Sequence, residues 1–423
     1  MSEWIQKSLG EITSYLAKGI PPKYVDELNE NTIYVLNQKC NRDFVISYEQ
    51  ARIHDLQQKK VSEEKMIKPG DVLINSTGEG TAGRIAQIWD IPHPTTTDGH
   101  MILIRPTEEV DKLYYGYAVK ANQVLIESLA EGSTGQTEVN KKRLQDEVII
   151  SFPVDKEEQH RIALMLEDID RKIAINNQIN RNLSEQAQAV FNSWFVKYEP
   201  FDEPMKETPT GFEAPESFEY VQIDSLEHVL ETGRRPKGGA VTEGIPSVGA
   251  ESVKGIGTFN TSSTKYIPVD FAAKQKTGKV NGYELMIYKD GGKPGEFHPN
   301  FSMFGEGYPF DEFFINEHVF KLDFGDRGYN EFAYFWFQTD YVMHWLESNG
   351  GKAAIPGINQ TVVNSIWILS PDSPKVKEYC EWIQPLFTQI LKNCYSNLRL
   401  AELRDTLLPK LMSGELDVSD LNV

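Results

Sequence analysis

The chain repeats its own plan once, at a displacement of about 217 residues. Four short segments of the first half return in the same order in the second half. The pairs are SLGEI (8–12) with SLEHV (225–229), GIPPK (19–23) with GRRPK (233–237), GDVLI (70–74) with YELMI (283–287), and VIISFP (148–153) with IWILSP (366–371). Since the order is shared and the displacement is nearly constant, the sequence predicts two diverged copies of one structural unit.

Each copy opens with a mixed segment, predicted at 1–154 in the first half and at 220–373 in the second. Short alternating apolar runs such as GDVLIN and EHVFKLDFG are separated by Gly, Pro and Asn, which is the pattern of strands and turns. The aromatic-rich stretch FAYFWFQTDYVMHWL at 332–346 predicts buried helices by its length and periodicity. We therefore expect an α+β fold with two repeated mixed domains.

A long helix is predicted after each mixed domain, at 155–198 and at 374–414, and residues 415–423 are predicted to be a tail. Apolar side chains recur in these helices at steps of three and four residues, as in a coiled coil. The two seams contain Ile162, Leu166, Ile169, Ile173, Leu183, Ala187, Val190 and Trp194, and then Tyr379, Ile383, Leu386, Ile390, Leu400, Arg404, Leu407 and Leu411. Gly414 is a typical stop signal, whereas Pro385 predicts a kink or a restart in the second helix. We expect the helices to pair in antiparallel fashion and to separate the two domains.

Asparagines interrupt both seams at the same phase. Asn176 and Asn180 occupy consecutive core positions of the first helix, and Asn393 and Asn397 occupy those of the second. A buried asparagine that faced leucine would lack a partner, so asparagine pairs fix the register of a coiled coil. Antiparallel pairing would bring all four into one layer. The alternative is that they border a stripe open to solvent.

An acidic, proline-rich linker is predicted at 199–219, between the first helix and the second domain. It contains four prolines, seven carboxylates and a single lysine, and contributes about a third of the net charge of −19. A negative chain opposes nucleic-acid binding, because DNA-binding proteins present Lys and Arg to phosphates. Much of the excess negative charge lies in this one segment, so clusters of basic residues elsewhere can still form a local site.

The remaining composition indicates a cytoplasmic protein. No apolar run is long enough to cross a membrane, and the N-terminal MSEWIQKSLGEI lacks the pattern of a signal peptide. Cys40, Cys380 and Cys394 are odd in number and share no metal-binding spacing, which favours reduced thiols over disulfides or zinc.

Sequence motifs for catalysis are weak or missing. GEGTAG at 78–83 fits the glycine pattern of a dinucleotide site, but the next residues alternate like a strand and reach Pro92, which favours a hairpin turn. HPTTTDGH at 93–100 brings two histidines and an aspartate together, yet the spacing favours a polar loop over a metal site. A phosphate-binding loop and a nucleophile elbow are both lacking. We expect no catalytic residues, no metal and no cofactor in this chain.

Basic and amide side chains gather in glycine-containing loops, where they can extend toward a ligand. Lys and Arg suit phosphates and guanine, and Asn or Gln suit adenine. The DNA-binding candidates are Arg234, Arg235 and Lys237 in TGRRPKGG, Gln136, Asn140, Lys141, Lys142 and Arg143 in GSTGQTEVNKKR, Lys352, Asn359 and Gln360 in SNGGKAAIPGINQT, and in addition Lys23 and Arg84. For any single residue, an ordinary solvated loop is the alternative.

Two helical segments resemble those of type I restriction–modification specificity subunits. LRDTLLPKLMSGELDVSDL (403–421) is similar to their C-terminal signature, and residues 159–195, which end in SWF, are similar to their central conserved helix. LNQKCNRDF (36–44) and GSTGQTEVN (132–140) also resemble parts of their target-recognition domains.

The resemblance implies that each mixed domain is a target-recognition domain that reads half of a split site in double-stranded DNA. The helices would space the domains and recruit two modification subunits, which carry S-adenosylmethionine for methylation of adenine, and restriction subunits would join to cleave. The chain itself would be a non-catalytic subunit. Two other functions stay open: a scaffold that binds only proteins, and a nucleotide-dependent enzyme built on GEGTAG. Salt-dependent DNA binding would separate the leading interpretation from the scaffold.

Overall fold

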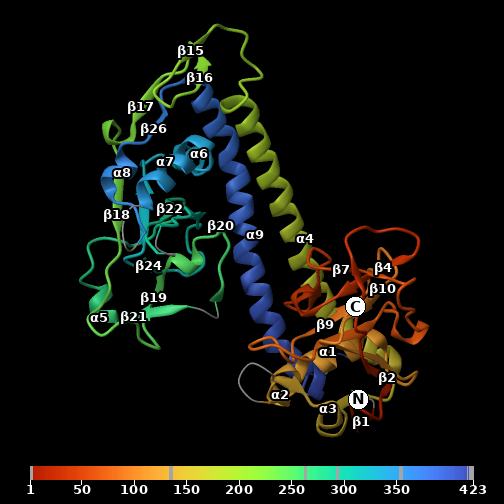
Figure 1. Cartoon of the computed structure of the whole chain (residues 1–423). Helices are drawn as coiled ribbons and strands as arrows, with labels where there is room; N and C mark the ends of the chain where they lie inside the picture. Colours follow the sequence, from red (N-terminus) through yellow and green to blue (C-terminus); the bar gives the residue numbers. More distant parts are fainter. Residues whose placement is uncertain are drawn as a thin grey trace. The chain divides into compact units, whose positions relative to one another are not determined.

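The computed structural model describes residues 3–132, 137–261, 264–291, 295–351, 356–416 and 418. The chain divides into two compact units. The first comprises Met1–Arg171 and Ala401–Val423, and the second comprises Lys172–Leu400. Each unit therefore contains one mixed domain together with parts of both long helices (Figure 1).

The mixed domain of the first unit consists mainly of short strands. Its elements are β1 (Trp4–Ser8), β2 (Thr13–Lys18), β3 (Tyr24–Val25), β4 (Thr32–Leu36), β5 (Asn41–Arg42), β6 (Val45–Ile46), β7 (Arg52–Asp55), β8 (Asp71–Asn75), β9 (Ile85–Ile88), β10 (Thr95–Thr97), β11 (Met101–Pro106), α1 (Lys112–Ala121), α2 (Gln123–Ser128), β12 (Ala130–Glu131), β13 (Glu138–Val139), α3 (Lys141–Glu147) and β14 (Ile149–Pro153).

The mixed domain of the second unit follows a similar sequence of elements. These are β15 (Met205–Glu207), β16 (Glu213–Pro215), β17 (Tyr220–Gln222), β18 (Val229–Thr232), β19 (Ile245–Val248), β20 (Gly255–Ile256), β21 (Lys265–Ile267), α5 (Val269–Ala272), β22 (Leu285–Tyr288), β23 (Phe301–Met303), β24 (Phe314–Ile315), β25 (Val319–Asp323), α6 (Arg327–Trp336), α7 (Asp340–Gly350), α8 (Gln360–Asn364) and β26 (Trp367–Leu369).

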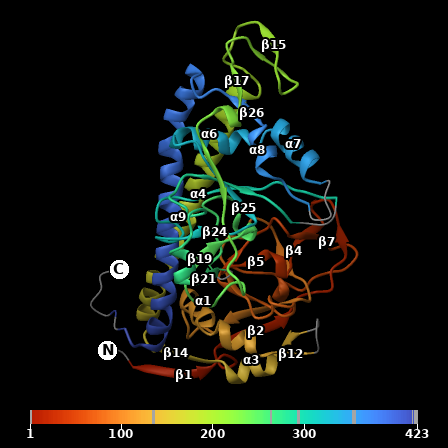
Figure 2. The ribbon, with the colours of Figure 1, turned by 90° about the vertical axis from the view of Figure 1, so that its left-hand side faces the viewer.

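The two mixed domains share the order of strands in their main sheets. The first sheet runs β2-β11-β8-β9, and the second runs β18-β25-β22-β23 with β20 added at its edge. In the first domain β1 pairs with the last strand, β14 (Figure 2), and in the second domain β17 pairs with the last strand, β26. The prediction of a repeated α+β unit is therefore confirmed.

The central strands β8 and β11 each contain a continuous apolar run, because both faces of the sheet are covered. In β8, Val72 and Ile74 belong to the apolar core shared with α1, whereas Leu73 points into a second, smaller core. In β11, Ile102 and Ile104 join the first core and Leu103 the second. Successive side chains of a strand point to opposite faces, so two covered faces require a continuous apolar run.

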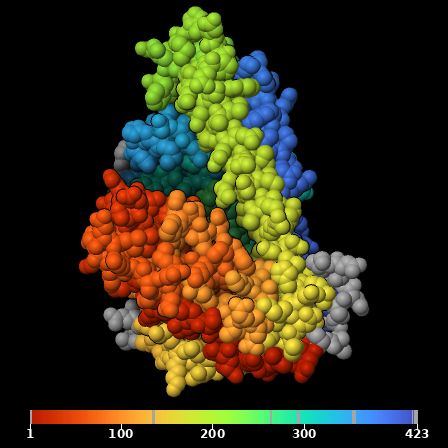
Figure 3. Space-filling model, turned by 90° about the vertical axis from the view of Figure 1, so that its right-hand side faces the viewer, coloured from red at the N-terminus to blue at the C-terminus, as the bar shows by residue number. Residues whose placement is uncertain are grey.

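The two long helices are α4 (Lys156–Phe195) and α9 (Pro374–Ser413). In the second unit the Tyr379 hydroxyl donates to the Ala187 carbonyl, at 3.0 Å, while Asn176 donates to Asn397, at 2.7 Å. Partner numbers fall along one helix as they rise along the other, so the helices run antiparallel there. Figure 3 shows part of α4, in yellow-green, beside α9, in blue. The helix α9 passes through Pro385 without ending, so the restart predicted there does not occur.

Aromatic rings attach the end of α4 to the core of the second domain. Phe191 is fully buried, with its ring centroid 5.4 to 6.4 Å from those of Phe195, Phe332, Phe335, Trp336 and Tyr379. These partners come from α4, α6 and α9. The last turns of α4 are therefore part of the domain core and do not form a free connecting rod.

Two segments contain more structure than the sequence predicts. In the predicted linker 199–219, β15 pairs with β16, and Phe201 packs edge-on against Phe218 with 4.8 Å between ring centroids. The prediction of a polar loop for HPTTTDGH is wrong at residues 95–97, which form the buried strand β10, parallel to β4. Threonine tolerates this position because it is β-branched, and the hydroxyls of Thr95 and Thr96 donate to the His93 and Lys65 carbonyls. Within the described ranges, no helix has the length and apolar character to cross a membrane.

Candidate nucleic-acid interface

The glycine-rich segment GEGTAG is a hairpin turn, as predicted. It joins β8 to β9, which pair in antiparallel fashion, so no helix follows the glycines and the dinucleotide interpretation fails. Gly78, Gly80 and Gly83 all have positive φ angles, of 112°, 67° and 87°. These backbone conformations favour glycine, which explains the composition of the turn without a bound nucleotide.

The turn lies beside the loop that precedes α3. Thr77 forms an isolated antiparallel bridge with Glu138, and the backbone N–H of Val139 donates to the Ser76 carbonyl at 2.8 Å. Lys18 forms an ion pair with the same Glu138. The structure thus brings the turn that precedes Arg84 next to the segment that contains the candidates of the first domain.

Hydrogen bonding within the domain occupies part of the first candidate cluster. The Asn140 side chain caps α3, accepting from the backbone N–H groups of Lys142 and Arg143 at 3.0 and 3.2 Å. The Arg143 guanidinium bonds the carboxylates of Glu131 and Glu147, and these bonds raise its pKa.

Of the remaining candidates in this cluster, Arg84 is half-buried and donates to the Gly80 carbonyl at 2.9 Å. Lys141 and Lys142 are exposed and have no ion pair among the described residues, so they are the cations free to bind phosphate. The candidate Gln136 lies outside the described residues.

The basic loop of the second domain follows β18 directly. Arg234 and Lys237 are exposed, and Arg235 lies 3.8 Å from the Glu317 carboxylate with most of its side chain in solvent. A Cβ atom on Gly233 would collide with the Ile315 carbonyl, so only glycine allows this approach of the backbone. Gly238 and Gly239 have φ angles of 99° and 88°, which turn the chain back.

A second loop of this domain is attached to the basic loop. The Gln360 side chain donates to the Leu230 carbonyl at 2.7 Å, in the strand that leads into the basic loop. Asn359 caps α8 by accepting from the Val362 N–H at 3.0 Å. The bridge between Asp290 and Gly357 connects this loop to the turn after β22. Lys352 lies outside the described residues.

Both domains therefore share one arrangement of strands, turns and loops, but the side chains in these loops differ. In each, the turn after the third strand of the main sheet is bridged to the loop before a short helix, and an asparagine caps that helix. Asn140 and Asn359 are the two caps, so their side-chain oxygens serve local structure. Exposed basic residues in the adjacent loops and in the first turn of α3 remain as the candidates for contact with DNA.

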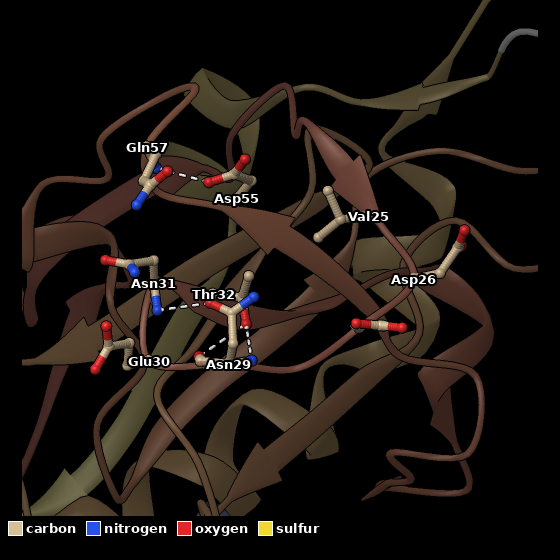
Figure 4. Close-up of a pocket in the computed structure, with 9 residues that line it drawn as sticks. Val25, Asp26, Asn29, Glu30, Asn31, Thr32, Asp55 and Gln57 are labelled. Atoms are coloured by element: carbon tan, nitrogen blue, oxygen red, sulfur yellow. Dashed lines mark hydrogen bonds between the residues drawn. The ribbon is translucent and has the colours of Figure 1, made fainter.

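Lys23 lies apart from these loops, just before β3 in the other sheet of the first domain. Its backbone N–H donates to the His54 imidazole at 2.8 Å, while its ammonium group is exposed. The adjoining depression is lined by four carboxylates, four neutral polar residues and one valine (Figure 4), namely Val25, Asp26, Glu27, Asn29, Glu30, Asn31, Thr32, Asp55 and Gln57. Such a negative surface repels phosphate, so Lys23 is the weakest of the candidates.

The four seam asparagines contact one another in the second unit. Asn393 donates to Asn180 and Asn176 donates to Asn397, both at 2.7 Å, and Asn397 donates onward to Asn177 at 2.8 Å. Asn176 and Asn393 are only 2% and 7% exposed. The amides thus satisfy one another inside the helix pair.

One charged cluster was not predicted from the sequence, and it lies where α1, α4 and α9 meet in the first unit. Asp170 binds Arg404 and Tyr117, and Lys120 lies beside it. Arg404 is a charged residue in a seam that otherwise contains apolar residues and two asparagines, and that position was the available signal. Within the described ranges, no group of three or more His, Cys, Asp or Glu side chains could hold a metal ion.

Comparison with known proteins shows similarity to one family. Residues 1–185 match the family model described as type I restriction modification DNA specificity domain. The chain is 22% identical to the type I restriction enzyme HindI specificity subunit of Haemophilus influenzae, over 98% of this chain and 100% of that relative. It is 24% identical to the MjaIX specificity subunit of Methanocaldococcus jannaschii, over 99% and 95%. Over almost its whole length, this chain is similar to type I restriction–modification specificity subunits.

A solved structure of this family has the same fold. The type I S subunit from M. genitalium aligns with a TM-score of 0.55 at 17% identity, covering 97% of this chain and 96% of that one. The likeness to this structure extends over nearly the whole chain and concerns the fold.

Replacing Arg234, Arg235 and Lys237 with alanine is expected to weaken DNA binding and to make it less dependent on salt. Each lost phosphate contact should lower the slope of log affinity against log salt by about 0.9, because fewer counterions are released. Fluorescence anisotropy over a salt series measures the slope. A triple alanine variant of the exposed Lys254, Lys274 and Lys276 changes the net charge equally. If both variants lower the slope to the same extent, the loop makes no special contact.

Proposed function

We propose that each mixed domain of this chain reads one half of a bipartite site in double-stranded DNA. The observation that carries the proposal is the repeated framework with different side chains on it. The first domain offers Lys141 and Lys142, whereas the second offers Arg234, Arg235 and Lys237. Two domains of one architecture but unlike contact residues would recognise two unlike half-sites, since base edges are read by individual side chains.

The long helices are proposed to space the two domains and to dock two modification subunits. S-adenosylmethionine would bind on those subunits, which would methylate adenine, and restriction subunits would complete the complex. The four contacting asparagines support a fixed register for the helix pair, because a shift would leave amides opposite apolar side chains. We assign the complex to the cytoplasm, where the free thiols of Cys40, Cys380 and Cys394 stay reduced.

A domain exchange tests this function. Residues 1–154 are replaced by the matching domain of a relative with a different methylation motif, in cells that contain the modification subunits. Because β1 and β14 pair with each other, the exchanged segment keeps its own closing strands. Methylome sequencing should show that one half of the motif changes while the other half stays the same.

The reciprocal exchange of residues 220–373 is the control, and it should change the other half only. If either exchange altered both halves of the motif, the domains would not read DNA independently. A chain that supported no bipartite methylation would point instead to the scaffold function, which the family relationship does not favour.

A further inference from the structure

The charged cluster of the first unit joins the first domain to both long helices. Asp170 of α4 is its centre: its carboxylate accepts from Arg404 of α9 at 2.6 Å and from the Tyr117 hydroxyl of α1 at 2.9 Å. The Lys120 ammonium, also on α1, lies 3.7 Å from the same carboxylate. The side chains of Lys120, Asp170 and Arg404 are 12%, 24% and 17% exposed, so water screens these charges only partly.

Aromatic rings and one further carboxylate complete the surroundings of Lys120. Its ammonium lies 4.1 Å from the Phe44 ring centroid, a cation–π distance, and makes no hydrogen bond to the described part of the chain. Phe44 has a φ of 66°, a strained conformation for a side chain of its size, and that conformation accompanies the ring contact. Burial lowers the pKa of Lys120 to about 8, although Asp170 opposes the shift. Asp405 bonds Arg404 at 2.9 Å on the outer side.

The second half of the chain has apolar residues at the equivalent positions. A displacement of 217 residues relates Tyr117 to Tyr334, and it pairs Lys120 with Phe337, Asp170 with Phe387 and Ala187 with Arg404. Tyr334, Phe337, Phe387 and Ala187 all belong to the apolar core of the second unit. Tyr334 packs edge-on against Phe387 with 5.8 Å between centroids, where Tyr117 binds Asp170 in the first unit. The first domain thus contacts the long helices through charged groups at this point, whereas the second domain contacts them through apolar side chains at the equivalent point. We call these two contacts the first and the second junction.

We infer that Asp170, Lys120 and Arg404 are positioning residues that fix the angle of the first domain on the helices, and thereby the gap between the two half-sites. The inference rests on the proposed function. An ion pair with short hydrogen bonds has a narrow geometry, so it specifies one orientation. Without the carboxylate, two partly buried cations would face each other, and the first domain would leave this orientation.

The test measures tolerance of the gap between the half-sites. The complex with its modification subunits is assembled with the Asp170→Asn variant, and methylation is measured on DNA with the native gap and with gaps one base pair shorter or longer. The preference for the native gap should fall by about tenfold, while discrimination against wrong bases in each half-site is retained. Simple unfolding of the first domain would instead abolish recognition of its half-site.

Two further variants make the outcome decisive. Asp168→Asn removes an exposed charge two residues away on α4 and should leave the preference unchanged. The triple variant Lys120→Phe, Asp170→Phe and Arg404→Ala installs the residues of the second junction and should restore a strict gap. If Asp170→Asn keeps the wild-type preference, or if the triple variant is no stricter than Asp170→Asn, the inference is overturned. If the wild-type complex recognises no bipartite site, the proposed function fails instead.

Discussion

Replacing Phe191 with alanine is expected to destabilise the second unit by about 4 kcal/mol, the magnitude typical of a large aromatic side chain removed from a closed core. The ring is fully buried and lies next to five other aromatic rings from three helices. These neighbours hold one another in place and cannot collapse into the cavity, so little of the loss is recovered. Urea denaturation followed by tryptophan fluorescence measures the change.

Ile175→Ala is the matched control for this substitution. Ile175 lies on the same helix but is 43% exposed, so its truncation should change the free energy of unfolding by less than about 0.5 kcal/mol. If Phe191→Ala were as mild as the control, the end of α4 would be loosely attached to the domain. The closing SWF of the helix would then need an explanation other than core packing.

Substitution of Asn393 with leucine is expected to destabilise the helix pair by about 1 to 3 kcal/mol, since a polar partner is left unsatisfied. The Asn393 side chain donates to the side-chain amide oxygen of Asn180 and accepts from the Gln389 side chain, both at 2.7 Å. Leucine offers neither bond at a position that is 7% exposed. Replacing Asn180 as well removes the orphaned amide, so the double variant should regain most of the stability.

The free energies of unfolding of the wild type, both single variants and the double variant form a double-mutant cycle. We expect a coupling energy of at least about 1 kcal/mol between the two positions. Asn182→Leu is the control, because Asn182 is an exposed asparagine on α4, two residues from Asn180. A coupling energy near zero would mean that the asparagines line a solvated stripe, and their proposed role in fixing the register would be lost.

The fold could be predicted from the sequence because its signals are long and repeated. The seams of α4 and α9 extend over many turns, and the matched segments place the strands of one half onto those of the other. Predictions failed where the signal was short. The sequence of three threonines in β10 predicts a polar loop, yet their main chain pairs with β4 and their side chains are buried. Nothing local to these residues indicates a parallel partner about 60 residues earlier.

The candidate contact residues were harder to predict, because residue type alone does not show what a side chain already binds. Asn140 and Asn359 resemble adenine readers, but both cap short helices. Arg143 resembles a phosphate ligand, but ion pairs with Glu131 and Glu147 neutralise its charge. Glu131 is twelve residues away in the sequence, and only the fold brings it next to Arg143. Exposed lysines and arginines with few partners remain, and partners are assigned by three-dimensional neighbours rather than by spacing in the chain.

The first unit combines residues 1–171 with residues 401–423, and this has a consequence for protein synthesis. Leu408, Leu411 and Met412 of α9 belong to the same apolar core as Leu9 and Ile12, near the start of the chain. A ribosome that adds roughly 5 to 20 residues per second needs on the order of 10 to 50 s to pass from residue 171 to residue 401. During that time the nascent first domain exposes the apolar surface that α9 later covers. The N-terminal domain of this chain is therefore the first to emerge, but its core is completed only when the last helix has been made.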